Sequence, residues 1–328
     1  MNGRVRSAST REALLDASTG LLSGFLYLSY VLSFAFLLPV QHAFAGRGRR
    51  SGLAAAAWSL LVIIAGQAVR MFELRTGDIL IALAGILPPA ALIAALAFIN
   101  LKVGKLSSGA KILIAAAALS IIAAPLLMRV TADEGFSAFL TESIGSTMSA
   151  SGLGADSNAY IGEAVKSAIT VLQSAFAPLL LATLAASWWL GSVQAARRAI
   201  RGGTADASLL ESLRLDTVRV PNVALWPTLL CWAGLFAALA TGQTGLLRAA
   251  AWNLALCAAS LYAVQGLGVL SHLSRQFNAT RILRLAAPLA VMTALLSATA
   301  GAVILIALPL VGITEVWFPY RTIKGALK

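Results

Sequence analysis

The stretch of residues 248–284 constrains the fold more than any other part of this chain. It is an apolar run of membrane-spanning length that contains two amides, Asn253 and Gln265, and leads into a basic loop. A lipid-facing amide would leave its donors and acceptors without partners, which is costly. At about 100° per residue, Asn253 lies on one side of the predicted helix, while Tyr262 and Gln265 lie on another. We therefore expect a helix in the middle of a bundle.

The composition predicts a protein that is embedded in a membrane. Hydrophobic residues make up 59% of the chain and charged residues only 12%, against about 25% charged in an ordinary soluble domain. The net charge of +12 is typical of basic loops on the cytoplasmic side of a membrane. No basic run carries interleaved aromatic residues, so nucleic acid is not an expected partner. Cys231 and Cys257 both lie in apolar segments, which predicts neither a disulfide framework nor a metal site.

The apolar segments predict an all-α protein, a polytopic transmembrane helical bundle of a bacterial inner membrane, with about eight spanning segments. A cytoplasmic N-terminal segment, residues 1–20, precedes the transmembrane helical domain of residues 21–311, and a C-terminal tail of residues 312–328 follows it. The spanning segments are expected near residues 21–41, 53–69, 79–99, 112–128, 169–193, 223–240, 249–270 and 285–311.

Basic residues on both sides of the first segment conflict with a single crossing, because they favour the cytoplasmic side. The chain is therefore expected to cross to about residue 34 and to return as a short helix near Pro39. A signal peptide cleaved after Ala45 is the alternative, but cleavage would leave three arginines outside. The arginines that flank the first segment are Arg4, Arg6 and Arg11 before it, and Arg47, Arg49 and Arg50 after it.

The same rule assigns the loops to the two sides of the membrane. The connection of residues 129–168 is polar and poor in basic residues, so it is expected outside, with an amphipathic helix near residues 135–148. The tail would lie outside if residues 285–311 crossed once, and its side stays open at this stage. The residues expected together on the cytoplasmic face are Arg47, Lys105, Arg198 and Arg281.

Two consecutive prolines, Pro88 and Pro89, lie in the middle of the predicted helix of residues 79–99. Each removes a backbone donor and clashes with the preceding turn. The pair is expected to break the helix or to kink it by more than about 20°. Discontinuous helices near the midplane build binding sites in many transporters, and a packing kink is the alternative interpretation.

Five residues are the candidates for binding a small molecule: Asn253, Gln265, Tyr262, Gln67 and Gln173. Amides at membrane depth either join helices or contact a ligand, and the sequence leaves both open. No apolar segment has an acidic residue near its centre, which disfavours ion-coupled pumping. No H-E-x-x-H or Ser/His/Asp set is present, so we expect no catalytic residue, no metal, no cofactor and no enzyme activity.

Three stretches carry a resemblance to a known family. They are residues 219–222 leading to Trp226, the helix with residues 252–267, and the end with residues 312–321. Together they resemble the YybS-like family of bacterial inner-membrane proteins, which has no established activity. The family usually has an acidic residue before a tryptophan, and here Glu315 is slightly displaced from Trp317. More distantly, the first half is similar to substrate-binding membrane components of energy-coupling-factor vitamin transporters.

The leading hypothesis is a transporter-like membrane component that binds a small molecule within the bundle. The chain contains no Walker motif, so energy for transport would come from partner proteins on the cytoplasmic face. The arginines of residues 197–219 and the G-x-x-x-G of Gly20 and Gly24 are the candidate docking elements. The alternative is a membrane scaffold or assembly factor without a ligand, whose polar residues satisfy one another.

Overall fold

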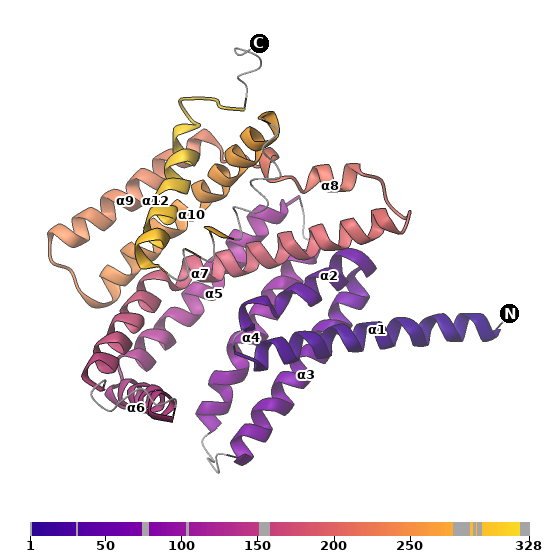
Figure 1. The fold of residues 1–328 in the computed structure, drawn as a ribbon, viewed down its shortest axis with the longest axis horizontal. Helices are drawn as coiled ribbons and strands as arrows, with labels where there is room; N and C mark the ends of the chain where they lie inside the picture. The colour runs from indigo at the N-terminus through magenta and orange to yellow at the C-terminus, as the bar shows by residue number, and fades with distance from the viewer. Residues whose placement is uncertain are drawn as a thin grey trace. The chain divides into compact units, whose positions relative to one another are not determined.

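The computed structural model shows a chain of helices joined by short connections (Figure 1). No strand occurs in the residues that it describes, which confirms the predicted all-α class. The described residues are 2–30, 32–73, 79–102, 105–150, 158–277, 289–290, 293 and 297–321.

Five helices are long and apolar enough to cross a membrane, and they define a membrane-embedded protein. Two shorter apolar helices, Gly85–Asn100 and Gly301–Thr314, accompany them. The predicted last segment, residues 285–311, is only partly described. The five long segments are Arg49–Phe72, Ser108–Thr131, Tyr160–Arg201, Asn222–Ala240 and Gly245–Gln276.

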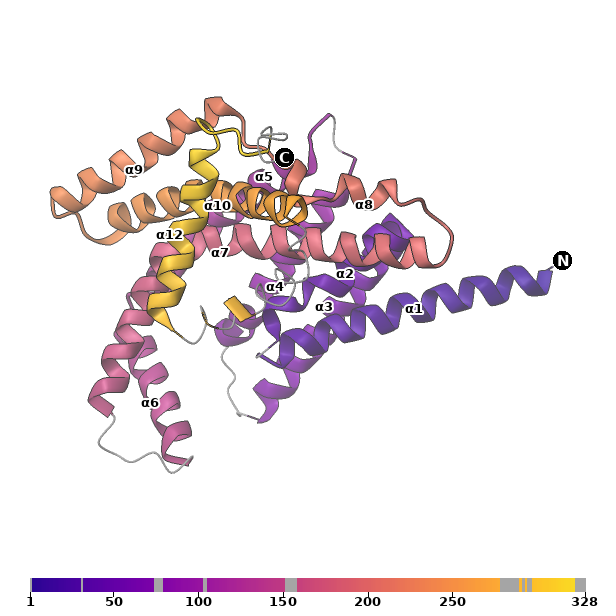
Figure 2. The same cartoon turned by 45° about the horizontal axis from the view of Figure 1, so that its top comes forward.

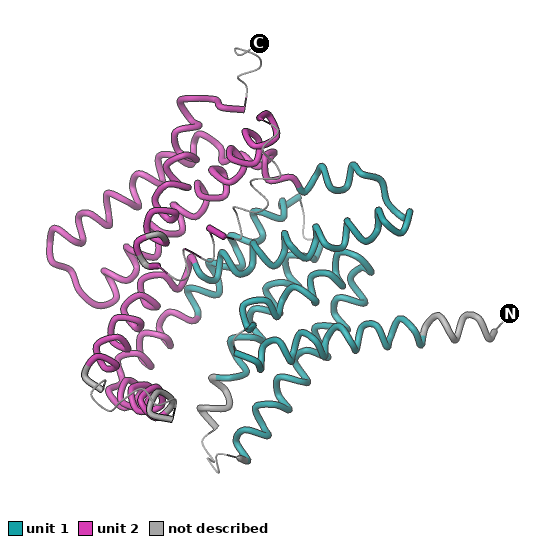
Figure 3. The backbone as a smooth tube through the Cα atoms, in the orientation of Figure 1, with its two compact units in different colours: residues 1–122, 179–213 teal, residues 123–178, 214–328 magenta. Residues whose placement is uncertain are grey.

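The chain divides into two compact units (Figure 3). Unit 1 comprises Met1–Ile122 and Leu179–Leu213, and unit 2 comprises Ala123–Pro178 and Arg214–Lys328. Two helices, α5 (Ser108–Thr131) and α7 (Asn158–Arg201), contribute residues to both units. The stretch predicted as one transmembrane domain therefore consists of two packing units.

In unit 1, α1 (Asn2–Leu28) packs along α3 (Arg49–Glu73), as Figures 1 and 2 show. A Cβ atom on Gly20 would lie 2.4 Å from the Cβ of Trp58, and one on Gly24 would lie 2.5 Å from the Cβ of Val62. The G-x-x-x-G surface therefore brings two helices of the same chain together. Because α3 covers it, this surface is not free to receive a partner protein.

The first apolar segment bends back on itself, as the distribution of arginines predicts. After α1 the chain passes through η1 (Ser33–Ala35) into α2 (Leu37–Arg47). Arg47, at the end of α2, forms an ion pair with Asp16 of α1 at 3.0 Å. The turn lies before Pro39, because a proline in the first turn of a helix loses no intrahelical hydrogen bond.

The prolines of α4 (Ile79–Asn100) lie inside one continuous helix, so the helix is not interrupted at Pro88 and Pro89, and the predicted kink stays a prediction. Pro89 has no N–H to donate to the Gly85 carbonyl one turn earlier. The hydroxyl of Tyr27, on α1, donates to this carbonyl at 3.0 Å. A neighbouring side chain thus satisfies a backbone group that the proline leaves without its helical donor, which is how helices with internal prolines persist in membranes.

The middle of the chain contains three further helices besides α5. The predicted amphipathic helix of the outer loop corresponds to α6 (Glu134–Ala150), and α8 (Ser208–Ser212) is a single short turn. The helix α7 has 44 residues, a length of about 66 Å at 1.5 Å per residue. A hydrocarbon core of about 30 Å cannot contain it, so α7 extends beyond the bilayer.

Unit 2 is organised around α10 (Gly245–Gln276), which packs against α9 (Leu225–Ala240) and α12 (Ala298–Thr314). Figure 2 shows α12 lying against α10. The backbones of the two helices touch at glycines: a Cβ atom on Gly266 would lie 2.1 Å from the Leu308 carbonyl oxygen. The middle position predicted for the helix with Asn253 and Gln265 is confirmed within this unit.

The described part of the C-terminal tail, up to Arg321, lies at the end of unit 2 where α10 ends. Arg275, in the last turn of α10, forms an ion pair with the Asp216 carboxylate at 3.1 Å. Arg321 donates to the backbone carbonyl of the same Asp216 at 2.7 Å. Arg275 and Arg321 therefore lie at the same end of unit 2. The arginines of this end then predict a cytoplasmic tail.

Cysteine labelling tests this topology, in a background with Cys231→Ser and Cys257→Ser. A membrane-impermeant maleimide should label Ser146→Cys in intact cells. It should label Arg198→Cys and Phe318→Cys only after permeabilisation, because both lie at ends that the arginine distribution assigns to the cytoplasm. Labelling at position 318 in intact cells would place the tail outside.

Candidate functional site

Asn253 of α10 bonds to the backbone of α7 one turn before Pro178. Its amide nitrogen donates to the Gln173 carbonyl at 2.6 Å, and its amide oxygen accepts from the Ala177 N–H at 2.7 Å. This carbonyl and this N–H are four residues apart, the pair that a regular α-helix joins directly. The side chain therefore inserts into the hydrogen-bond ladder of α7, an arrangement that bends helices. The second amide hydrogen goes to Ala249, at 2.7 Å.

The Gln173 side chain, also a candidate, points to α5. Its amide nitrogen donates to the Thr131 hydroxyl at 2.6 Å, and that hydroxyl donates to the Leu127 carbonyl. Gln173 thus joins the part of α7 that belongs to unit 2 to the last residue of α5. Its backbone carbonyl is also the acceptor for Asn253, so these two candidates belong to one set of contacts.

Gln265 lies next to Gly266, at the glycine contact of α10 and α12, and is 3% exposed. Its amide nitrogen donates to the Gly312 carbonyl of α12 at 2.9 Å. Its amide oxygen accepts from the Val220 N–H, in the connection before α9, at 2.7 Å. The side chain therefore ties three segments of unit 2 together.

Tyr262 is fully buried at the contact of α10 with its neighbours. Its carbonyl faces Gly312, and Thr228 of α9 lies beside its hydroxyl. Among the described residues, that hydroxyl has no hydrogen bond of standard geometry. The ring contributes mainly to packing, in which a buried aromatic side chain is one of the largest contributors.

Gln67 lies in unit 1, at the proline-containing helix. A Cβ atom on Gly85 would lie 2.6 Å from the amide carbon of Gln67, so this amide packs directly on the α4 backbone. The backbone carbonyl of Gly85 accepts a hydrogen bond from the Tyr27 hydroxyl. The five candidates thus fall into three separate places: Gln67 at α4, Asn253 with Gln173 at α7, and Gln265 with Tyr262 at α12.

Arg321, at the end of the described chain, is buried and makes the largest set of polar contacts that the sequence did not predict. Arg321 is 8% exposed, and the Glu315 side chain with which it pairs is 7% exposed. Its Nη1 donates to the carbonyls of Asp216 at 2.7 Å and Val218 at 2.8 Å. Its Nη2 donates to the Gln265 carbonyl at 3.1 Å and to Glu315 Oε2 at 2.9 Å.

Three charged side chains beside this arginine complete the same end of unit 2. The Asp216 carboxylate accepts from Arg214 and Arg275. The hydrogen bond from Arg214 is the largest cause of the lowered pKa of Asp216, and the charge of Arg275 adds to it. The sequence showed these residues only as charges in or beside loops. Arg214 is two residues from Asp216, but Arg275 is 59 residues away.

A second amide cluster missed by the sequence analysis lies in unit 1. Gln41 of α2 is 1% exposed and exchanges hydrogen bonds with Asn100 of α4, at 2.7 Å and 3.3 Å. Its amide nitrogen also donates to Ser192 of α7 at 3.0 Å. Gly191 leaves room for this approach, because a Cβ atom there would lie 2.7 Å from the Cβ of Gln41. The cluster joins three helices.

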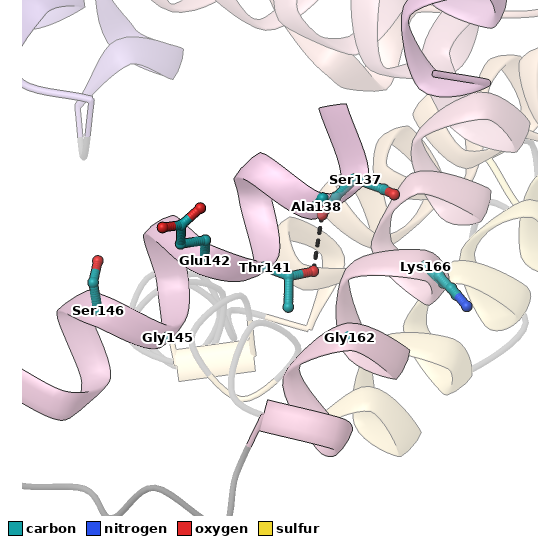
Figure 4. A pocket seen from close by; sticks show the side chains of 8 residues that line it. All are labelled: Ser137, Ala138, Thr141, Glu142, Gly145, Ser146, Gly162 and Lys166. Atoms are coloured by element: carbon teal, nitrogen blue, oxygen red, sulfur yellow. Dashed lines mark hydrogen bonds between the residues drawn. The ribbon is translucent and has the colours of Figure 1, made fainter. Parts of the chain in front are cut away.

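An open depression of about 550 Å³ lies between α6 and α7 (Figure 4). Figure 4 shows Glu142 and Lys166 pointing away from one another, while Thr141 donates to the Ser137 carbonyl at 2.8 Å. The polar groups that line the depression therefore do not converge on one point. Within the described residues, no group of three or more His, Cys, Asp or Glu side chains is placed to hold a metal ion.

Comparisons with protein-family models, with curated proteins and with solved structures find no match to this chain. The class of protein is therefore defined by the helices themselves. It is an all-α membrane protein whose polar side chains at membrane depth join helices.

Proposed function

We propose that this protein is a multi-pass scaffold or assembly factor of a bacterial inner membrane, acting through partner proteins rather than through a ligand bound by its intramembrane amides. The observation that supports the proposal is the bonding of these amides. Asn253 and Gln265 use both their nitrogen and their oxygen on neighbouring segments. This is the pattern expected of amides that join helices in a membrane.

Binding a ligand at these amides would require breaking contacts already made. A ligand at Gln265 would have to displace the Val220 N–H and the Gly312 carbonyl, both parts of the backbone. Each displaced group would need a new partner, because a buried polar group left unpaired costs about 1–3 kcal/mol. A ligand would gain little net free energy from such an exchange.

The C-terminal end of α7 offers a surface for partner proteins. Arg197, Arg198 and Arg201 are exposed there, and α7 is too long to be contained in the hydrocarbon core. A cluster of exposed guanidinium groups favours acidic surfaces. We infer a cytoplasmic partner with an acidic face as the macromolecule that the scaffold holds.

A transporter-like component that binds a small molecule is the second candidate. The open depression between α6 and α7 favours it, because ligand sites are concave and occupy about 300–1,000 Å³. The distant resemblance of the first half to vitamin-transporter components also supports this candidate. Its ligand would meet Thr141 and Lys166 rather than the amides of α10.

Thermal unfolding in detergent distinguishes the two candidates. Asn253→Leu and Gln265→Leu should each lower the free energy of unfolding by roughly 0.6–2 kcal/mol, the range measured for hydrogen bonds between membrane helices. A pool of bacterial metabolites should leave all melting temperatures unchanged. Gln194→Leu, at an exposed position of α7, is the matched control and should change little.

One result would reverse this conclusion. The metabolite pool could stabilise the unmodified protein but not Asn253→Leu or Gln265→Leu, although that variant melts like the unmodified protein without the pool. The replaced amide would then bind a ligand. A ligand contact of that kind commonly accounts for a tenfold or larger change in affinity. The scaffold proposal would then be wrong for α10.

A further inference from the structure

The contacts of Arg321 match the donor set of a guanidinium group. A guanidinium has five N–H donors in a fixed planar fork. Four of them donate to Asp216, Val218, Gln265 and Glu315 Oε2. The fifth, on Nε, lies 2.8 Å from Glu315 Oε1 as an ion-pair contact outside hydrogen-bond angles. Five oxygens therefore surround one planar cation.

The oxygens come from separate parts of unit 2 that other contacts hold in place. Asp216 and Val218 flank the end of η3 (Leu215–Thr217), which packs on α10. The Gln265 carbonyl belongs to α10, and its side chain is fixed by Gly312 and Val220. Three of the five acceptors are thus backbone carbonyls whose positions do not depend on the arginine side chain alone.

A glycine provides the space for this cation. A Cβ atom on Gly268 would lie 2.6 Å from the Leu215 carbonyl oxygen and 2.9 Å from Nη2 of Arg321. Only glycine lets the 215–218 connection and the flat guanidinium both approach α10 this closely. The cradle is therefore shaped by the α10 backbone as well as by its polar groups.

We propose that this cradle is a guanidinium-binding site, formed by Asp216, Val218, Gln265 and Glu315, which the protein fills with its own Arg321. The tail is then an intramolecular ligand that fastens the connection before α9 to α10. A lysine ammonium cannot replace it, because three donors on one nitrogen cannot reach oxygens arranged around a planar fork. Shortening the side chain should leave a cavity that a small guanidinium ion can enter.

Chemical rescue of Arg321→Ala tests the site in the full-length protein in detergent. The variant should melt roughly 5–10 °C below the unmodified protein, since it leaves a buried carboxylate without its cation. Millimolar methylguanidinium should raise the melting temperature of this variant along a saturating curve. It should have no such effect on the unmodified protein, whose site is filled, or on the variant that also carries Glu315→Gln. Methylammonium at the same concentration should not rescue.

Two results would overturn the proposal. One is an Arg321→Ala variant that melts like the unmodified protein, and the other is a response to methylguanidinium no greater than that to methylammonium. If Arg321→Ala does not fold, the same titration is made on Arg321→Val, which keeps the packing of the first side-chain atoms and leaves the place of the guanidinium group empty. A specific response to methylguanidinium supports the site there, and its absence contradicts it.

Discussion

Replacing Gly312 by alanine should separate α12 from α10 and cost about 3 kcal/mol or more of unfolding free energy. The added Cβ atom would lie 1.9 Å from the Tyr262 carbonyl oxygen and 3.0 Å from the Gly266 nitrogen. Both are backbone atoms, so no change of rotamer can relieve the contact. Overpacking in well-packed cores typically costs 1–3 kcal/mol, and a backbone clash belongs at or above the upper end of that range.

The clash has a second consequence, because the same glycine carries an acceptor. The Gly312 carbonyl accepts from Gln265 at 2.9 Å, and moving α12 away would leave this buried amide with an unpaired donor. We therefore expect Gly312→Ala to be more harmful than Gln265→Leu, which removes the donor and leaves the helices together. Comparing their melting temperatures in the same detergent checks this order.

Gly234→Ala on α9 is the matched control. No atom would lie within 4 Å of its new Cβ atom, so the change adds the same methyl group to a helix of the same unit without a clash. Alanine exceeds glycine in helix propensity by about 1 kcal/mol, and this variant should be neutral or slightly more stable. Equal melting temperatures for Gly234→Ala and Gly312→Ala would contradict the close contact of α10 and α12.

The sequence predicted the features that depend on local composition. The run of residues 248–284 indicated a central helix, and α10 has that position in unit 2. The arginines around the first segment indicated a chain that returns, and α2 lies beside α1 with Arg47 on Asp16. Both predictions follow from solvation: apolar segments enter the bilayer and arginines stay at its edge.

The contacts of the polar residues could not be predicted in the same way. Periodicity placed Asn253 on one side of its helix, but its partner, the Gln173 carbonyl, is 80 residues away in the chain. The Gly85 carbonyl, which loses its helical donor at Pro89, accepts from Tyr27, and Tyr27 is 58 residues away. Spacing within one helix carries no information about which neighbouring helix supplies the partner.

Arg321 was the most difficult residue to assign from sequence. A basic residue after the last apolar segment is normally a solvated loop charge, and the positive-inside rule treats it as such. Its burial requires the Asp216 and Val218 carbonyls, 105 and 103 residues earlier, and Glu315 of the same tail. The pairing of Glu315 with Arg321 across six residues was the one local signal in the sequence.

Replacing Glu315 by alanine should cost about 3–5 kcal/mol, because it leaves the buried guanidinium of Arg321 without its counter-charge. Glu211→Ala removes an exposed carboxylate of α8 and should change stability by no more than about 0.5 kcal/mol. Detergent unfolding of the two variants, followed by helical circular dichroism, measures the difference. Similar losses in both variants would mean that the Glu315–Arg321 pair is not formed.

The double variant Glu315→Leu, Arg321→Met determines how much of that loss comes from the charge. Removing both charges is often far less harmful than removing one, since apolar side chains of similar volume avoid the desolvation cost. Recovery should remain incomplete here, because the Asp216, Val218 and Gln265 carbonyls would each lose a donor. We expect the double variant to lie between Glu315→Ala and the unmodified protein, with a coupling energy of about 0.5–3 kcal/mol in the mutant cycle.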